Sequence, residues 1–509
     1  MASTWAFEAQ GPGSIPGGGA MMRENCFREI AKKKGEKGGA LSRLDLVIVL
    51  AAGEGTRMKS SLPKVLHKIC GKSILEHLIN QISKLESKEL RVVVGAGSQE
   101  VSQALSTFSK SAKTVLQEVR RGTGDAVRIA LADSPTSGTL LVCAGDTPLL
   151  TSLTLESLLE NHNKIGALAT VLTAELPDPF GYGRIVKSNG DLISIVEERD
   201  ATAAEREITE INSGVYIFDI AALREALAKL GKKNSQGEEY LTDVIGILRK
   251  EGKKVATYLT EDFTEILGIN DRSQLADVTA LMRDRINEHL MLNGVTIVDS
   301  ASTWIDQTAS IEADVRIEPG TSIQGDCKIK SGAVIGPRTT LIDCEVGNLA
   351  EVIESHCEAS KIGNNAKVGP YSHLRSGTVL AGDVKVGSFV ETKNAKVGEG
   401  SKVPHLSYVG DAEIGKETNI GAATIFVNYD GEAKHQTKVG DHVRIGSDSM
   451  LIAPVTIGDG AYTAAGSVIN EDVPAGALGI GRARQVNILG WVLKKRKGSK
   501  SAAAAEEKK

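Results

Sequence analysis

The sequence predicts an α/β domain with a mainly parallel sheet, followed by a parallel β-helix built from six-residue repeats. Four apolar runs in the first half alternate with helix-like segments such as 74–85 and 124–132, an order typical of parallel sheets with helices on both faces. In the second half, aliphatic residues recur at every sixth position, a period that fits neither an α-helix nor a β-hairpin. The four runs lie at 46–50, 91–95, 139–144 and 167–173.

The composition limits the classes of protein to which the chain can belong. With 509 residues it is longer than one ordinary domain, and 41% hydrophobic residues suffice for real cores. A formal charge of −4 gives no basic excess that would indicate a nucleic-acid partner, and no apolar run is long enough to predict a membrane span. Six cysteines without a C-x-x-C pair favour reduced thiols in the cytoplasm over a disulfide framework or a cysteine zinc site.

Residues 1–43 are expected to form a flexible N-terminal extension. The stretch GPGSIPGGG is rich in glycine, AKKKGEK is charged, and no apolar core of a signal peptide is present. Met21 or Met22 offers an alternative start. We assign this segment no function.

The stretch Leu44–Val65, LDLVIVLAAGEGTRMKSSLPKV, organises the first domain. Its apolar opening predicts a strand buried on both faces, and that strand leads directly into a glycine-containing loop. Small residues and glycines allow a tight turn with exposed N–H groups, which phosphate oxygens require. Arg57 and Lys64 add positive charge within reach of the same loop. This arrangement suits a nucleoside triphosphate.

Two polar residues follow apolar segments that are expected to end at the same edge of the sheet. Asp146 closes the run TLLVCAGD, and Asn270 follows the apolar pair Ile266-Leu267. A carboxylate and an amide oxygen at this edge fit Mg²⁺. From the residues alone, Asp146 could equally cap a helix, because Thr147-Pro148 follows, and Asn270 could be a simple turn residue.

The string L-A-A-G-x-G-T-R-M, with Pro63-Lys64 shortly after it, resembles the signature of sugar-phosphate nucleotidyltransferases. Among these, the chain is most similar to the bifunctional N-acetylglucosamine-1-phosphate uridyltransferase / glucosamine-1-phosphate N-acetyltransferase family. The resemblance covers 44 to about 495. It implies a Rossmann-like nucleotidyltransferase domain over 44–272 and a left-handed parallel β-helix over 294–482. It also implies a cytoplasmic enzyme that acetylates glucosamine 1-phosphate with acetyl-CoA and then transfers a uridylyl group from UTP to N-acetylglucosamine 1-phosphate.

The resemblance also implies the roles of residues in the first domain. Arg57 and Lys64 match catalytic cations, and Asp146 and Asn270 match ligands of Mg²⁺. Ala144 departs from the family, which often has tyrosine before Gly-Asp, and Gly237–Thr242, GEEYLT, resembles a further family segment. The residues that match UTP and UDP-N-acetylglucosamine contacts are Leu50, Ala51, Ala52, Gly53, Lys64, Gln117, Gly122, Thr123, Ala144, Gly145, Asp146, Gly183, Glu197, Asn212 and Asn270.

A helix that connects the two domains is predicted over 273–293. Its apolar residues fall on one stripe at helical spacing, which indicates packing rather than a binding site. The stripe consists of Leu275, Val278, Leu281, Met282, Ile286 and Leu290.

The repeats that follow predict a prism whose core is filled by one aliphatic side chain per hexad, three hexads per coil. A tail over 483–509 is expected to be partly disordered. The repeated positions are Ile311, Ile317, Ile323, Ile329, Ile335, Leu341, Ile362, Val368, Leu374, Leu380, Val386, Val397, Val403, Val409, Ile414, Ile420, Val439, Ile445, Leu451 and Ile457.

Polar residues in the repeats match the family's acetyltransfer site. His405 matches the general base, and Pro404 before it replaces a glycine that is frequent in the family. The segment Thr424–Phe426 also departs from the common enterobacterial-type loop. Contacts of glucosamine 1-phosphate match Arg375, Lys393, Tyr408 and Asn419, and those of acetyl-CoA match Ala422, Asn428, Tyr429, Ser447, Ala465 and Arg482. By the same resemblance the β-helices associate as a homotrimer.

Two other interpretations are compatible with the repeats. The chain could be a single nucleotidyltransferase whose β-helix only assembles and regulates an oligomer, or a bifunctional enzyme for another base or sugar. The presence of Arg375, Lys393, His405, Tyr408 and Asn419 together favours two activities over the scaffold.

Overall fold

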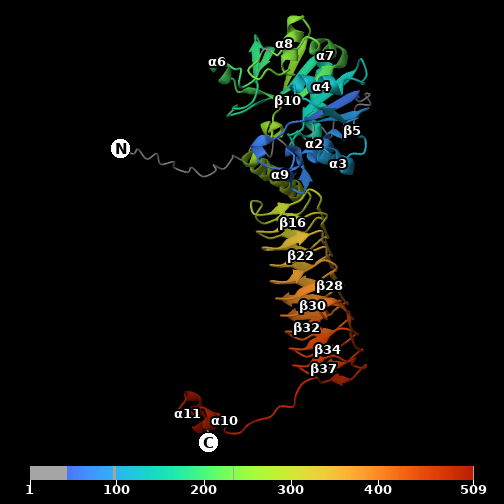
Figure 1. Ribbon diagram of the computed structural model, residues 1–509, viewed down its shortest axis with the longest axis vertical. Helices are drawn as coiled ribbons and strands as arrows, with labels where there is room; N and C mark the ends of the chain where they lie inside the picture. The colour runs from blue at the N-terminus through green and yellow to red at the C-terminus, as the bar shows by residue number, and fades with distance from the viewer. Residues whose placement is uncertain (1–42, 96–98, 233, 508–509) are drawn as a thin grey trace, which may run out of the picture.

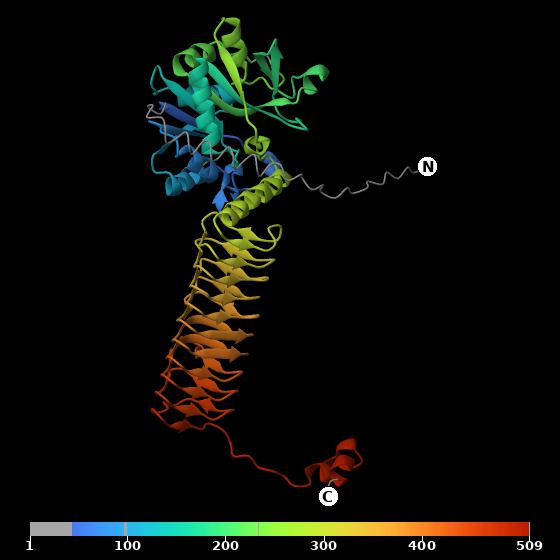
Figure 2. The ribbon, with the colours of Figure 1, turned by 180° about the vertical axis from the view of Figure 1, so that it is seen from behind.

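The computed structural model describes residues 43–95, 99–232 and 234–507. A rounded α/β domain sits at one end of a long column of stacked strands, and the C-terminal tail extends from the other end (Figures 1 and 2). Nearly all of the predicted extension over 1–43 lies outside the described residues. Within the described residues, no helix combines the length and apolarity needed to cross a membrane.

The α/β domain is built on a nine-stranded sheet, and the predicted mainly parallel arrangement is confirmed. Strands β1, β4, β5 and β6 run parallel to one another, and β11 is parallel to β7, whereas β10 is antiparallel to both β6 and β7. The strand order is β11-β7-β10-β6-β1-β4-β5. The bounds are β1 Leu46–Ala51, β4 Leu90–Gly95, β5 Ala112–Gln117, β6 Thr139–Ala144, β7 Ala169–Glu175, β10 Glu210–Asp219 and β11 Val255–Leu259.

Helices cover both faces of this sheet, which explains the continuous apolar runs. Alternate residues of β1 enter opposite cores: Val47 and Val49 pack with α2 and α5, and Leu46 and Ile48 pack with α4, α7 and α8. The helices are α2 Ile74–Ile82, α3 Gln99–Phe108, α4 Thr123–Ala130, α5 Ser152–Ile165, α6 Ala203–Arg206, α7 Ile220–Leu227 and α8 Asp243–Lys250. Short elements complete the domain: η1 Thr56–Met58, η2 Lys64–Leu66, η3 Phe263–Ile266, and strands β2 Lys68–Ile69, β3 Lys72–Ser73, β8 Arg184–Ser188 and β9 Asp191–Val196.

Helix α9 (Arg272–Leu292) joins the α/β domain to the column (Figure 2). On one side, an Arg285 Nη1–H group donates to the carbonyl oxygen of Leu149 at 2.5 Å. On the other side, the fully buried Asn287 side chain donates to the carbonyl oxygen of Thr303 at 3.0 Å, and Arg283 stacks over the ring of Trp304. These contacts tie the first coil of the column to the same helix that follows Asn270.

The column is a parallel β-helix with three strands per coil, running from β12 (Thr296–Ile297) to β39 (Leu478–Gly479). Ile317 is in register with Ile335, as three hexads per coil require. Every predicted repeat position is buried except Ile311, which is half-buried. The predicted hexapeptide architecture is therefore confirmed.

The strands that carry the polar residues extend from β22, in the upper part of the column, to β32, in its lower part (Figure 1). One face of the prism is an 11-stranded sheet, and the other two faces together form a 17-stranded sheet. The 11-stranded sheet contains β27 Lys385–Ser388, β29 Lys402–His405 and β31 Asn419–Ile420, and the 17-stranded sheet contains β22 His356–Glu358, β25 His373–Leu374, β28 Glu391–Val397, β30 Tyr408–Ile414 and β32 Ile425–Val427.

Within the tail, where we expected partial disorder, the structure contains two short helices, α10 (Trp491–Lys495) and α11 (Lys500–Glu506). The reason is local: alanine is the best helix former, and Ser499 caps α11 by accepting a hydrogen bond from the Ala502 N–H group. The alanine run within the tail, where partial disorder was expected, therefore forms a helix.

Candidate functional site

The loop after β1 folds back so that its two cations face the ends of other strands. Arg57 lies in η1 and Lys64 begins η2. Gly55 has φ +62°, and a β-carbon there would lie 2.6 Å from Cβ of Lys64. Because glycine has no β-carbon, Lys64 can pack directly against the loop at Gly55.

Four predicted residues meet at the carboxyl edge of the sheet. The Lys64 ammonium lies 2.5 Å from Oδ2 of Asp146 and 3.4 Å from Oδ1 of Asn270. An Arg57 Nη2–H group donates to the same Asn270 oxygen at 2.9 Å. Lys64 and Asp146 are largely buried, with side-chain exposures of 12% and 22%. The cluster thus places two hard oxygen donors beside two cations.

Backbone contacts fix the two oxygen donors in place. The N–H group of Gly145 donates to the Leu50 carbonyl at 2.9 Å, which couples the end of β6 to β1, and the N–H group of Ile269 donates to the Asp146 carbonyl. The helix-capping alternative for Asp146 is wrong, since Thr151 caps α5. Carboxylate and amide oxygens are the donors that Mg²⁺ prefers, so Asp146 and Asn270 fit a divalent cation.

A second group of predicted residues lies at the start of α4. Gln117 is buried, and its amide donates to Oδ2 of Asp125 at 2.9 Å and to the Gly122 carbonyl at 3.3 Å. Its own carbonyl oxygen has no hydrogen-bond partner within the described part of the chain. Gly122 has φ +110°, and a β-carbon there would lie 2.4 Å from the Glu239 carbonyl oxygen. Only glycine fits at this point, because the backbone of Glu239 packs directly against the half-buried Gly122.

The third predicted group joins β9, β10 and the loop before β8. A β-carbon on Gly183 would lie 3.5 Å from Oε2 of Glu197 and 3.6 Å from Cβ of Asn212. Thr242 Oγ1 donates to Oε1 of Glu197 at 3.0 Å, and burial raises the pKa of the Glu197 carboxyl. The three predicted sugar-side residues are thus brought together.

Some residues of this region were missed by the sequence reasoning. Glu239 accepts from the Gly124 N–H group at 2.8 Å, and Thr123 Oγ1 accepts from the Leu241 N–H group at 3.0 Å. Thr242 also donates to Glu197, as described above. The segment Gly237–Thr242, GEEYLT, therefore contacts both the group around Gln117 and the group around Glu197. Arg120 Nε–H donates to the Ala52 carbonyl at 2.9 Å and its guanidinium pairs with Glu54. The resemblance of GEEYLT was a signal for the first group, but no pattern in the sequence singled out Arg120.

In the β-helix, the predicted phosphate contacts gather at one edge of the prism. Arg375 directly follows β25, and Lys393 stands in β28 one coil further on, in register with Gly410. The ammonium of Lys434, a residue that the sequence reasoning missed, lies beside Lys393 and lowers the pKa of Lys393. Arg375 also contributes to that shift, whereas Glu391 accepts from Arg375 Nη1–H at 2.9 Å. Crowded cations of this kind suit an anionic ligand.

His405 lies at a different edge of the prism, at the end of β29. Ser388 and His405 are in register across Pro404, so the proline is accommodated within the strand. The chain then turns at Leu406, which has φ +53°, and enters β30 at Tyr408. Among the described residues no hydrogen bond or ion pair involves the exposed imidazole of His405. The imidazole is therefore available to a ligand.

The predicted acetyl-CoA residues divide between these two edges. Ala422, Ser447 and Ala465 stand in successive coils at the His405 edge, where the Asp448 N–H group donates to the Ala422 carbonyl and the Gly466 N–H group donates to the Ser447 carbonyl. The side chain of Arg482 lies 3.8 Å from the β-carbon position of Gly466.

Asn428 instead lies at the other edge, near Arg375 and Lys393. It donates to Oδ2 of Asp411 at 2.5 Å, and the exposed Tyr429 follows it. Asn419 is on the 11-stranded face, in register with Lys402 and Arg444, and is not brought to Arg375 and Lys393 within one chain. The Thr424–Phe426 departure has a packing role, since Phe426 is fully buried in the core.

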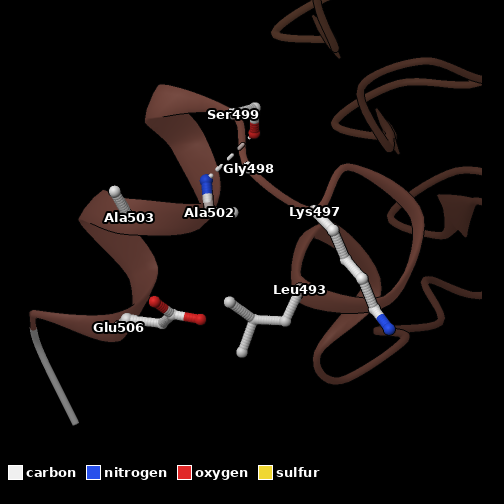
Figure 3. Close-up of a pocket in the computed structure, with 7 residues that line it drawn as sticks. All are labelled: Leu493, Lys497, Gly498, Ser499, Ala502, Ala503 and Glu506. Atoms are coloured by element: carbon white, nitrogen blue, oxygen red, sulfur yellow. Dashed lines mark hydrogen bonds between the residues drawn. The ribbon is translucent and has the colours of Figure 1, made fainter.

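A hollow in the tail contains none of the predicted residues. Its volume is about 350 Å³, and it lies between α10 and α11 (Figure 3). Its lining is Leu493, Lys497, Gly498, Ser499, Ala502, Ala503 and Glu506. We therefore do not assign it to the chemistry above.

Comparison with known proteins identifies both parts of the chain. Residues 47–213 match the MobA-like NTP transferase domain, 299–397 match the GMPPB C-terminal domain, and 436–471 match the bacterial transferase hexapeptide family. The chain is 52% identical to the bifunctional protein GlmU of Streptomyces avermitilis, over 90% of this chain and 96% of that protein. It is 50% identical to GlmU of Corynebacterium glutamicum, with 90% and 96% covered, and 49% identical to GlmU of Mycobacterium tuberculosis, with 90% and 94% covered.

Proposed function

The chain belongs to the GlmU family of bifunctional proteins, and from this premise we propose how its two parts make UDP-N-acetylglucosamine. It is both a uridyltransferase and an acetyltransferase. We assign uridylyl transfer to 44–272, acetyl transfer to 294–482, and the connection to 273–293. Both reactions take place in the cytoplasm, in keeping with the free thiols of the described cysteines.

In uridylyl transfer, a phosphate oxygen of N-acetylglucosamine 1-phosphate attacks the α-phosphorus of UTP. The bond between the α-phosphorus and its bridging oxygen breaks, and pyrophosphate leaves with the electron pair. The enzyme uses a divalent cation, which we take to be Mg²⁺ held by Asp146 and Asn270, and which neutralises phosphate charge when bound. Arg57 and Lys64 stabilise the remaining negative charge. The observation that carries this proposal is the meeting of these four side chains at one edge of the sheet.

The two other groups of the first domain bind the rest of the nucleotide sugar. The unpartnered carbonyl oxygen of Gln117 accepts a hydrogen bond from the uracil ring, and the half-buried backbone at Gly122 lies beside the base. Glu197 and Asn212 bind the sugar hydroxyl and amide groups beside Gly183. The loop Leu50–Gly53 and residues Ala144 and Gly145 line the path between base and phosphates.

In acetyl transfer, the amine of glucosamine 1-phosphate attacks the thioester carbon of acetyl-CoA. His405 takes the proton of the attacking nitrogen and returns it to the sulfur as the carbon–sulfur bond breaks. Arg375, Lys393 and Tyr408 hold the sugar phosphate, and Asn419 binds the sugar.

The sites for this second reaction form between chains of a homotrimer. In support, the His405 edge and the Arg375 edge of one chain are separate, and Asn419 lies on another face of the prism. Assembly of three prisms would place the Arg375 edge of one chain beside the His405 edge of the next.

The test follows both products in the full-length chain. Thiol release from acetyl-CoA is measured with glucosamine 1-phosphate, and pyrophosphate release is measured with UTP and N-acetylglucosamine 1-phosphate. We expect His405→Ala to abolish thiol release and leave pyrophosphate release intact. If the unaltered oligomer releases no thiol, the β-helix is a scaffold and the bifunctional proposal fails.

A further inference from the structure

A cluster of two histidines and a glutamate lies on the outside of the β-helix and has no part in either reaction described above. His356 and Glu358 alternate with the buried Cys357 along β22, so both side chains point outward. His373 in β25 is in register with His356, one coil further along the column. The fold therefore brings the three side chains to one spot.

The three side chains place one nitrogen or oxygen donor each close to the other two. Nε2 of His356 lies 2.8 Å from Oε1 of Glu358, and Nε2 of His373 lies 3.9 Å from the same oxygen. One ligand atom from each residue falls within 4.8 Å of the other two. Ligands that bind one zinc ion at about 2.0–2.1 Å are separated by about 3.3 Å, so small rotamer changes suffice to close this triangle.

A separate observation points to a ligand at this spot. Nε2 of His373 is a buried atom without a hydrogen-bond partner. A buried polar atom with no partner costs free energy, and a metal ion would remove that cost by taking the nitrogen lone pair. The two imidazole rings meet edge to face with centroids 5.2 Å apart, so the two histidines lie in direct contact beside the carboxylate.

We propose that His356, Glu358 and His373 bind one transition-metal ion per chain, with Zn²⁺ as the representative ion. Two imidazoles and one carboxylate suit zinc, nickel, cobalt or copper, whereas the oxygen donors Asp146 and Asn270 suit Mg²⁺. The thiol of Cys357 is not a ligand, since it points into the core and burial raises its pKa. The site is thus distinct in position and in chemistry from the magnesium site of the α/β domain.

The experiment titrates full-length, metal-free protein without a polyhistidine tag with ZnCl₂ in a calorimeter. Excess Mg²⁺ is present throughout, so that the oxygen-donor site is already filled. We expect one Zn²⁺ per chain, competition by Co²⁺ and Ni²⁺, and no competition by added Ca²⁺. The visible spectrum of bound Co²⁺ gives a second readout of imidazole ligation.

Variants locate the site. His373→Ala and Glu358→Gln each remove one ligand from an outward-facing position, and each should weaken Zn²⁺ binding by at least about tenfold. His289→Ala is the matched control, because it removes an exposed histidine on α9 and should leave the affinity unchanged. Thiol release from acetyl-CoA by each variant verifies that the β-helix is folded, and pyrophosphate release verifies the same for the α/β domain. The proposal is overturned if the unaltered chain does not bind Zn²⁺, or if it binds equally well in His373→Ala and Glu358→Gln.

Discussion

The ammonium of Lys64 lies 2.5 Å from the carboxylate of Asp146, although 82 positions separate the two residues in the chain. The parallel pairing of β1 with β6 brings them together, because both residues follow the carboxyl end of their strand. The pair is largely buried, so its charges interact more strongly than exposed charges would.

Replacing this lysine tests the role of the pair. We expect Lys64→Ala to reduce kcat for pyrophosphate release by about 10²–10³-fold, since it removes a cation that stabilises charge developing in the transition state. Thiol release from acetyl-CoA should not change. Lys84→Ala is the control: this exposed lysine lies in the turn just after α2, and its replacement should be neutral. Equal losses in the two lysine variants would contradict a specific role for Lys64.

The hydrogen bond from Thr242 to Glu197 gives a prediction about pH. Burial raises the pKa of Glu197, and the Thr242 hydroxyl partly offsets this by stabilising the carboxylate. In Thr242→Val the Glu197 pKa should therefore rise further. The acidic limb of the pH profile of kcat/KM for pyrophosphate release should shift to higher pH, with the plateau less affected. An unshifted acidic limb would show that Glu197 is not needed in its charged form.

The same carboxyl also affects stability. A pKa raised in the folded state means that the folded chain binds the proton more tightly than the unfolded chain does. The free energy of unfolding contributed by Glu197 therefore falls as pH rises from the unfolded pKa through the raised folded pKa. Glu197→Gln should flatten this part of the stability curve of the α/β domain, measured by denaturant unfolding at several pH values. A curve with the same slope in the variant would contradict the assignment.

Gly122 gives a prediction about the base-binding segment. Its φ is +110° and a β-carbon would meet the Glu239 carbonyl at 2.4 Å, so Gly122→Ala should cost about 1–3 kcal/mol in the free energy of unfolding. The added methyl group should also push the start of α4 away from Glu239. Because this segment is proposed to bind the base, KM for UTP should rise. Gly166→Ala is the control that measures backbone strain alone. Gly166 also has positive φ, but no atom lies within 4 Å of its β-carbon position, so alanine there causes no steric collision. If both variants lose the same stability and keep the same KM, the contact between Gly122 and Glu239 is unimportant.

The core of the β-helix gives a prediction that separates the two activities. Phe426 is fully buried, and Phe426→Ala should cost about 3–5 kcal/mol locally. Because each coil is stabilised mainly by its neighbours, thiol release should be lost at lower urea concentration while the midpoint for pyrophosphate release stays unchanged. Met450→Ala, on the outer surface of a neighbouring strand, is the control and should be within about 0.5 kcal/mol of the parent. Parallel loss of both activities would instead indicate one cooperative unit.

These features differ in how far the sequence could predict them. The period of six identifies inward residues such as Ile335, because each hexad repeats the same contact with the core. Asp146 and Asn270 were expected at one edge because ligands bind beyond the carboxyl ends of parallel strands. Asp146 does follow a strand, β6, whereas Asn270 follows the short helix η3. No such rule predicts the hydrogen bond from the Gly124 N–H group to the Glu239 carbonyl, because it joins the first turn of α4 to an irregular segment whose path depends on the whole domain.

Lys434 and His373 show the same limit in the β-helix. Lys434 reaches Lys393 only through the conformation of an inserted loop. His373 faces His356 because some coils are shorter than three full hexads, so neighbours across coils cannot be found by counting in steps of 18. Repeats predict which residues point inward, whereas the partners of outward residues depend on the length of each coil.

The positions of the two candidate sites have a consequence for how the intermediate passes from one reaction to the other. The residues proposed for uridylyl transfer lie in the α/β domain, whereas His405 ends β29, which precedes β30 in the middle of the column (Figure 1). Because the two candidate sites lie in separate parts of the chain, we expect N-acetylglucosamine 1-phosphate to leave one site and reach the other by diffusion through the surrounding medium. Isotopically labelled intermediate added from outside should therefore mix with the intermediate formed by the enzyme, and the label should enter UDP-N-acetylglucosamine in proportion to its share of the common pool.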